Sequence, residues 1–90
     1  MIITTTPTIE GHPIQEYLGI ISSDAYVSEG FFQGKEEVMW QTRENALDRL
    51  ESLARKAGAN AVVGVAIDFE VRENLTYYVM ATGTAVVIPE

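Results

Sequence analysis

Apolar residues in the middle of the chain first recur at steps of three and four and then at steps of two. The first pattern spans residues 36–57 and predicts a long amphipathic helix. Its apolar stripe consists of Val38, Met39, Thr42, Ala46, Leu47, Leu50, Leu53, Ala54 and Ala57. Arg55 and Lys56 suit the negative end of the helix dipole, and Gly58 suits the left-handed position that ends many helices. The helix is therefore expected to stop at Gly58.

The alternating pattern begins directly after the helix and predicts a strand over residues 61–71. One of its two faces is apolar and is expected to be buried; its members are Val63, Val65, Ile67, Phe69 and Val71. The other face begins with small residues and ends with Asp68 and Glu70. We expect these two carboxylates to face solvent or an interface.

Alternation and β-branched residues predict three further strands, over residues 2–6, 14–27 and 76–88. Gly83 in the last of them predicts a bulge or a close approach of two backbones. The order of the elements is strand, strand, helix, strand, strand. This order predicts an α+β domain in which one helix covers one face of a mainly antiparallel sheet, with sequential hairpins making the strand pairings.

The 90 residues form a single domain, residues 1–90, and the composition suggests that it associates. Apolar residues make up 47% of the chain, and one helix leaves the second face of a sheet uncovered, so surface is expected to be buried between copies. The formal net charge of −7 argues against nucleic acid and anionic membrane as partners. Without a secretory signal or a long apolar run, the expected location is the cytoplasm.

Metal ligands are scarce in this sequence, which has no cysteine and only one histidine, His12. His12 lies in a Glu-Gly-His-Pro turn, and a closed ring of chains would gather one imidazole from each copy on its axis. Asp68 and Glu70 share a strand face and supply oxygen ligands suited to Ca²⁺ or Mg²⁺. His12, Asp68 and Glu70 are therefore the metal-ligand candidates, although a turn and a solvated strand end explain them more simply.

Several stretches together resemble the YbjQ-like family of small bacterial proteins. They are residues 1–6, 13–20, 53–70 and 81–86, and the most specific is Gly-Ala-Asn-Ala-Val-Val-Gly at residues 58–64. The family is largely uncharacterised and carries a heavy-metal-binding label. The resemblance implies a dodecin-subunit type of fold, assembly as a pentameric ring and a divalent metal ion as ligand. The chain departs from the family between Gly30 and Thr42, where it is shorter.

Catalysis has little support in the sequence, which lacks a nucleophile elbow, a Walker loop and a GxGxxG motif, and we expect a protein that is not an enzyme. The main alternative to metal binding is a planar ligand held between subunits, as the fold-related dodecins hold flavin. The aromatic residues suited to it are Tyr26, Phe31, Phe32 and Trp40. Packing in a core or an interface is the simpler role for them.

Overall fold

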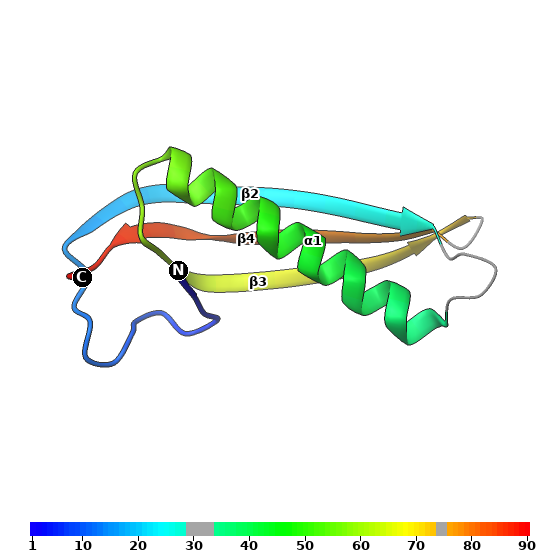
Figure 1. The fold of residues 1–90 in the computed structure, drawn as a ribbon, viewed down its shortest axis with the longest axis horizontal. Coiled ribbons are helices and arrows are strands. Elements are labelled where there is room, and N and C mark those ends of the chain that lie inside the picture. Colours follow the sequence, from blue (N-terminus) through cyan, green and yellow to red (C-terminus); the bar gives the residue numbers. More distant parts are fainter. Residues whose placement is uncertain (29–33, 74–75) are drawn as a thin grey trace.

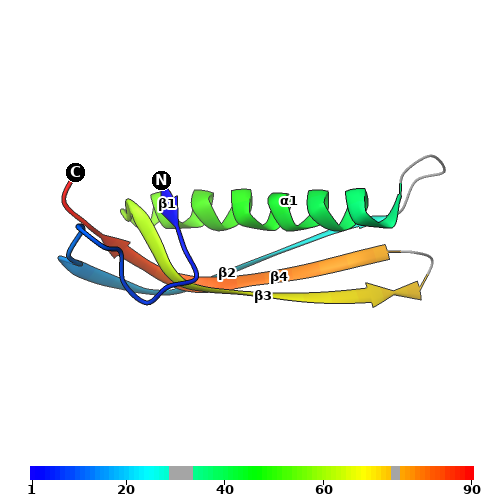
Figure 2. The ribbon, with the colours of Figure 1, turned by 90° about the horizontal axis from the view of Figure 1, so that it is seen from below.

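One helix lies along one face of a four-stranded sheet (Figure 1). The computed structural model describes residues 1–28, 34–73 and 76–90. Its elements are β1 (Ile2–Ile3), β2 (Glu16–Ser28), α1 (Lys35–Lys56), β3 (Ala61–Arg72) and β4 (Thr76–Val87). Seen from the side, α1 lies on one side of the long strands, and no helix of the described residues covers the other (Figure 2). The predicted α+β class is therefore confirmed.

The strands lie in the order β1-β3-β4-β2, which places the last strand of the chain inside the sheet. β4 is antiparallel to both β3 and β2, and β1 is parallel to β3. The prediction that sequential hairpins make the pairings is wrong except for β3 and β4. Because α1 carries the chain back along the sheet, β2 and β3 run in the same direction with β4 between them.

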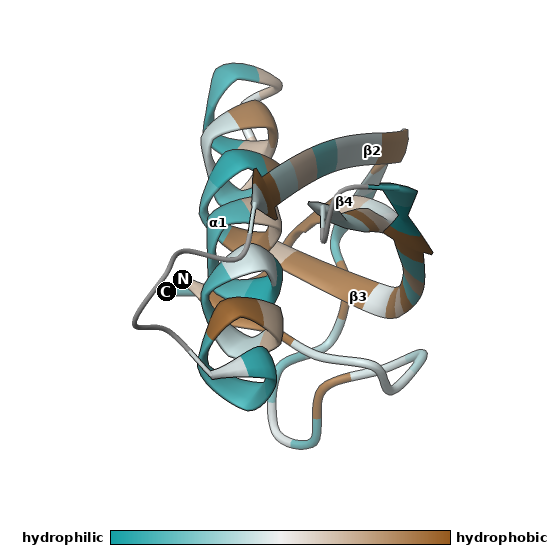
Figure 3. Ribbon diagram, turned by 90° about the vertical axis from the view of Figure 1, so that its right-hand side faces the viewer, coloured by the Kyte–Doolittle hydropathy of each residue, from teal (hydrophilic) through white to brown (hydrophobic). Residues whose placement is uncertain are grey.

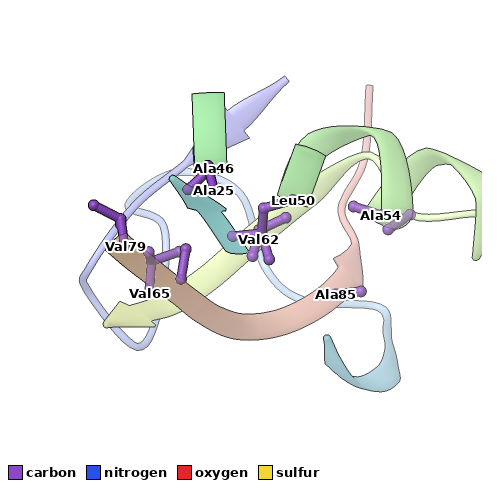
Figure 4. Close-up of a cluster of buried hydrophobic side chains, with 10 residues drawn as sticks. Ala25, Ala46, Leu50, Ala54, Val62, Val65, Val79 and Ala85 are labelled. Atoms are coloured by element: carbon purple, nitrogen blue, oxygen red, sulfur yellow. The ribbon is translucent and has the colours of Figure 1, made fainter. Parts of the chain in front are cut away.

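The helix packs through a stripe of residues spaced four apart. The fully buried members are Val38, Thr42, Ala46, Leu50 and Ala54. Leu50 lies among Ala46, Ala54 and Val62 in the main core between α1 and the sheet (Figure 4). The one buried hydroxyl of the stripe, that of Thr42, donates to the Val38 carbonyl at 2.7 Å, so its burial leaves no donor unpaired. Hydrophilic residues cover the side of α1 that faces away from the sheet (Figure 3).

The helix ends in a Schellman motif, as Gly58 predicted. Gly58 has φ 90°, its N–H bonds the Arg55 carbonyl at 3.0 Å, and the N–H of Ala59 bonds the Ala54 carbonyl at 2.9 Å. Asn60 then fastens the end of the chain to this corner. Its side chain donates to the Ile88 carbonyl and accepts from the Ile88 N–H, both at 2.8 Å.

Replacing Gly58 with valine is expected to lower the free energy of unfolding by about 1 to 2 kcal/mol, because a Cβ strains the left-handed conformation. Urea denaturation measures the change. The matched control is Gly34→Val, since Gly34 has φ −79° and no atom lies within 4 Å of a Cβ built there. Equal losses at the two positions would contradict the explanation by backbone strain.

A bulge interrupts the alternation of β3. The register with β4 shifts between Val63 and Ala66, and Gly64 has φ 63°. The extra residue moves Val63 to the face away from α1, where it packs with Val86, while Val62 and Val65 enter the main core. The expectation that Val63 and Val65 share one face is therefore wrong, because the two-residue period fails at the bulge.

The far end of β3 is more exposed than its apolar pattern predicts. Phe69 is 43% exposed and Val71 is 56% exposed. Both point to the α1 side of the sheet, but α1 packs mainly on β2 and β4 and only lightly on β3. The prediction that these two side chains are buried within the chain is wrong for this geometric reason.

Among the described residues, the opposite side of the sheet is covered only at one end. Ile9 and Ile14 pack there over a second core of Ala61, Val63, Val86 and Ile88. Beyond this cover, the side chains that point away from α1 form what we call the open face. Its members include Ile20, Ser22, Asp24, Tyr26, Ser28, Ala66, Asp68, Glu70, Arg72, Thr76, Tyr78, Met80, Thr82 and Thr84.

Candidate functional site

Two neighbouring rows of side chains cross the open face. Asp24 and Asp68 are both register partners of Met80, so the first row runs Asp24, Met80, Asp68 across β2, β4 and β3. The second row runs Tyr26, Tyr78, Glu70 in the same way. Side chains directly opposite each other on adjacent strands have Cβ atoms about 4.5 to 5.5 Å apart. We call these six residues the open-face cluster.

The first row combines a thioether with two carboxylates. Met80 is 40% exposed, and Asp24 and Asp68 are exposed on either side of it. A thioether sulfur is a soft metal ligand, and carboxylates supply negative charge. Asp24 and Asp68 lie two strand spacings apart, about 9.5 Å, so both carboxylates can lean toward an ion above the Met80 sulfur. The row has the chemistry to bind a cation.

Tyr78 orients the carboxylate of Asp24. Its hydroxyl donates to Asp24 Oδ2 at 3.1 Å. This hydrogen bond to the carboxylate raises the pKa of the Tyr78 phenol above its usual value of 10.0, since the bond requires the phenol proton; desolvation and the Asp24 charge act in the same direction. One oxygen of Asp24 is thereby held in place, and the other remains available to a ligand.

Arg72 partly neutralises the negative charge of Glu70, which ends the second row. Its guanidinium carbon lies 4.3 Å from the centroid of the Tyr78 ring, and its Nη2 lies 3.6 Å from Glu70 Oε2. Both partners of this ion pair are exposed, so its contribution to stability is small. Within the described part of the chain, Asp68 has no comparable partner. The uncompensated negative charge of β3 is therefore greatest in the row that holds Met80.

The structure brings two of the three predicted metal ligands together. Asp68 and Glu70 lie two residues apart on the open face, as the alternation predicted. His12 lies in the exposed turn before β2, where its N–H bonds the Ile9 carbonyl at 3.0 Å. Asp68 lies level with Asp24, roughly 25 Å along β2 from the start of the strand. Within one chain His12 is therefore remote from the two carboxylates.

The structure also separates the aromatic residues that the sequence suggested for binding a planar ligand. Tyr26 lies on the open face, whereas Trp40 is 58% exposed on α1, which covers the other face. Phe31 and Phe32 lie outside the described residues. The aromatic neighbour that the structure gives Tyr26 is Tyr78, its register partner on β4.

Sequence reasoning missed Asp24, Tyr78 and Met80. The alternation of residues 76–88 already places Tyr78 and Met80 on the face opposite Val79. It does not reveal which residues of other strands lie beside them, because that depends on the pairing of β2 with β4. In the described ranges, no three side chains of His, Cys, Asp or Glu are grouped so that they could hold a metal ion. Within one chain, Met80 is the further ligand that the described residues place beside Asp24 and Asp68.

A second surface feature lies on the α1 side of β2. It is a hollow of about 400 Å³ between the strand and the helix. Its lining residues are Ser22, Ser23, Asp24, Arg49, Ser52, Leu53 and Lys56. Arg49 Nη1 donates to the Asp24 carbonyl at 3.1 Å, and the Ser23 hydroxyl donates to the Ala46 carbonyl at 2.7 Å. These two bonds tie the helix to β2 beside the hollow.

No helix in the described parts of the chain is long and apolar enough to cross a membrane.

Known proteins are similar to this chain in sequence and in fold. The chain matches, over residues 1–89, the model of a family described as "Putative heavy-metal-binding". It is 38% identical over 105 residues to a UPF0145 protein of Actinobacillus pleuropneumoniae serotype 5b (strain L20), covering 98% of this chain and 99% of the relative. Because 105 exceeds the 90 residues of this chain, the relative carries residues that this chain lacks.

A solved structure supports the fold independently. It is that of a protein of unknown function in the DUF74 family from Pediococcus pentosaceus ATCC 25745. The TM-score is 0.78, and the match covers 99% of this chain and 98% of the other at 19% sequence identity. At this identity the likeness concerns the fold alone. The sequence match extends over nearly the whole chain, and on that basis the protein belongs to the YbjQ-like family.

Proposed function

We propose that this protein is a homo-oligomeric binding protein that holds a soft or borderline divalent cation on the open face of its sheet, and that it is not an enzyme. The observation that carries the proposal is the row Asp24, Met80, Asp68, in which one thioether lies between two exposed carboxylates. The family description, which refers to heavy metals, agrees with a sulfur ligand better than with oxygen ligands alone.

The surroundings of the row favour binding over catalysis. The row lies on an exposed sheet surface, whereas a catalytic site needs groups held in a cavity that excludes water. A pentameric ring in the cytoplasm remains the expected form, and the uncovered sheet surface supports association between copies.

Three ligands from one chain leave the coordination of a metal ion incomplete. Water or side chains of another copy would supply the remaining positions. Asp68 supplies charge that no described cation neutralises, while Asp24 is oriented by Tyr78. We therefore expect Asp68 to contribute most to affinity and Met80 to determine which metal is preferred.

The test is calorimetric titration of the untagged, chelator-free protein with Cd²⁺ and, separately, with Ca²⁺. Asp68→Asn is expected to weaken Cd²⁺ binding at least tenfold, about 1.4 kcal/mol, because it removes the uncompensated charge. Met80→Leu is expected to remove the preference for Cd²⁺ over Ca²⁺, because it exchanges a thioether for a hydrocarbon of similar size.

Two control variants keep the result interpretable. Glu37→Gln removes one negative charge from the exposed first turn of α1, away from the open face, and is expected to leave the affinity unchanged. His12→Ala is likewise expected to have no effect. Loss of binding in His12→Ala with full binding in Asp68→Asn would refute this site and favour a ring of imidazoles.

A planar ligand is the second candidate, and one observation favours it. Tyr26, 69% exposed, lies directly opposite Tyr78 on the open face, so the two rings offer adjoining apolar surfaces. Titration with a flavin in place of the metal, followed by flavin fluorescence, distinguishes this function. Quenching that disappears in Tyr26→Ala and persists in Asp68→Asn would favour the planar ligand over the metal.

A further inference from the structure

The sheet has two long outer edges whose backbone groups are not paired within the described chain. One edge is that of β2, which pairs only with β4. The other is the part of β3 beyond the bulge. The first residues of the chain cover β3 only as far as Val65, whose N–H bonds the Thr4 carbonyl at 3.0 Å. Residues 66–72 of β3 therefore present an edge that no described strand covers.

Neither edge contains lysine or proline, although charged residues lie along both: Asp24 on β2, and Asp68, Glu70 and Arg72 on β3. Natural edge strands are commonly protected by lysine, proline or bulges. Residues 16–28 and 66–72 contain no lysine or proline. The only register shift in β2 lies near its start, between Tyr17 and Gly19, which leaves residues 20–28 regular. Two such edges on one sheet are suited to being covered by another strand.

The directions of the two strands determine what can cover them. β2 and β3 run the same way, on opposite sides of β4. When a second copy is placed so that its β3 lies beside β2, the two strands form a parallel ladder that continues the sheet. This contact uses a different surface on each copy, so repeating it closes into a ring or extends as a filament.

The side chains at the two edges complement each other. Phe69 and Val71 protrude from β3 on the α1 side. The hollow between β2 and α1 also lies on the α1 side, and it contains Leu53, which is 38% exposed. Arg49 and Lys56 make the hollow basic. Asp68 and Glu70 point to the opposite, open face, so the complementarity between the two edges on the α1 side is apolar.

We infer that the β2 edge of one copy pairs in parallel with the β3 edge of a second copy, and that Phe69 and Val71 of the second copy fill the hollow between β2 and α1. The inference rests on the homo-oligomer of the proposed function and names the surfaces that form it. It also adds to the metal site, because the acidic β3 edge of the second copy comes to lie beside Asp24. Each site then draws carboxylates from two chains.

Engineered cysteines test this contact, and the chain has no natural cysteine to interfere. Ser22→Cys on β2 is combined in turn with Ala66→Cys, Asp68→Cys and Glu70→Cys on β3; all four positions point to the open face. Within one chain β2 and β3 lie two strand spacings apart, about 9.5 Å. A disulfide requires Cα atoms within about 7 Å. Every disulfide formed is therefore between copies.

We expect at least one of the three pairs to yield, under mild oxidation, covalent products of three or more chains. Each chain carries one edge of each kind, so the links continue from copy to copy. A covalent dimer formed by Ser22→Cys alone would instead indicate antiparallel pairing of two β2 edges and would overturn the inference. Absence of products from all three pairs, while native mass spectrometry shows an oligomer, would place the contact elsewhere and leave the proposed function standing.

A charge introduced at the edge provides the second measurement. Val71→Lys is expected to convert the oligomer to monomers in native mass spectra, because a lysine cannot enter the basic hollow. The matched control is Asp48→Lys on the exposed side of α1, which is expected to keep the oligomer. An oligomer that survives Val71→Lys would overturn the edge pairing. A monomeric unmodified protein would refute both the pairing and the homo-oligomer.

Discussion

Replacing Leu50 with alanine is expected to lower the free energy of unfolding by about 3 kcal/mol. Leu50 is fully buried in the main core, and its neighbours there include Ala46, Ala54 and Val62. Alanines on a helix and valines on a strand cannot extend into the space that the leucine leaves, so most of the cavity persists. For a small domain this loss is a large fraction of the total stability.

Urea denaturation at a fixed protein concentration measures this loss, since the stability of an oligomer depends on concentration. Leu53→Ala is the matched control, because Leu53 is on the same helix but 38% exposed. Its expected cost is below about 1 kcal/mol in a dissociated chain. If Leu50→Ala cost no more than Leu53→Ala, the assignment of Leu50 to the core would be wrong.

Replacing Gly83 with alanine is expected to cost about 2 kcal/mol, although alanine normally suits a strand better than glycine. A Cβ at Gly83 would lie 2.7 Å from Val62 Cγ1 and 3.2 Å from Val65 Cγ2. It would also lie 3.3 Å from the Val63 carbonyl oxygen, which belongs to the backbone of the bulge and cannot turn aside. The close approach that the glycine predicted from the sequence is thus confirmed.

A double-mutant cycle with Val62→Ala isolates the cause. Removing the Cγ1 atom that lies nearest the added methyl group is expected to reduce the cost of Gly83→Ala by at least 1 kcal/mol. The stabilities of the two single variants and the double variant are compared under the same conditions. Strictly additive costs would show that the loss comes from somewhere other than this contact.

The local elements were predictable because their signals are local. The helix was expected over residues 36–57 and is found at Lys35–Lys56, since the stripe and Gly58 identify its face and its end. The last strand, expected over residues 76–88, is found at Thr76–Val87. In both cases residues close in sequence carry the decisive information.

The pairing of the strands was not predictable in the same way. Hairpins between neighbours are the usual choice, but β2 pairs with β4, which is separated from it by the helix and β3. The bulge of β3 is also a non-local feature, because it forms where Thr4 and Thr6 bond Val65 and Gly64 across the sheet. The alternating valines of residues 61–65 do not indicate that residues 4–6 will pair with them.

The candidate site shows the same limit. Asp68 and Glu70 were recognised from their spacing on one strand, and the structure places both on the open face. Met80 and Asp24 come from other strands and join Asp68 only through the register of β4. A site whose residues come from three strands cannot be predicted from the sequence until the order and register of those strands are known.

The position of β4 inside the sheet has a consequence for biosynthesis. β4 leaves the ribosome after β2, α1 and β3, yet β2 and β3 each hydrogen-bond to it and not to one another. Until residue 87 has emerged, the nascent chain has a helix and two long strands without a sheet to join them. The sheet is therefore expected to assemble only after β4 has been synthesised, and until then β2 and β3 are exposed strands prone to association.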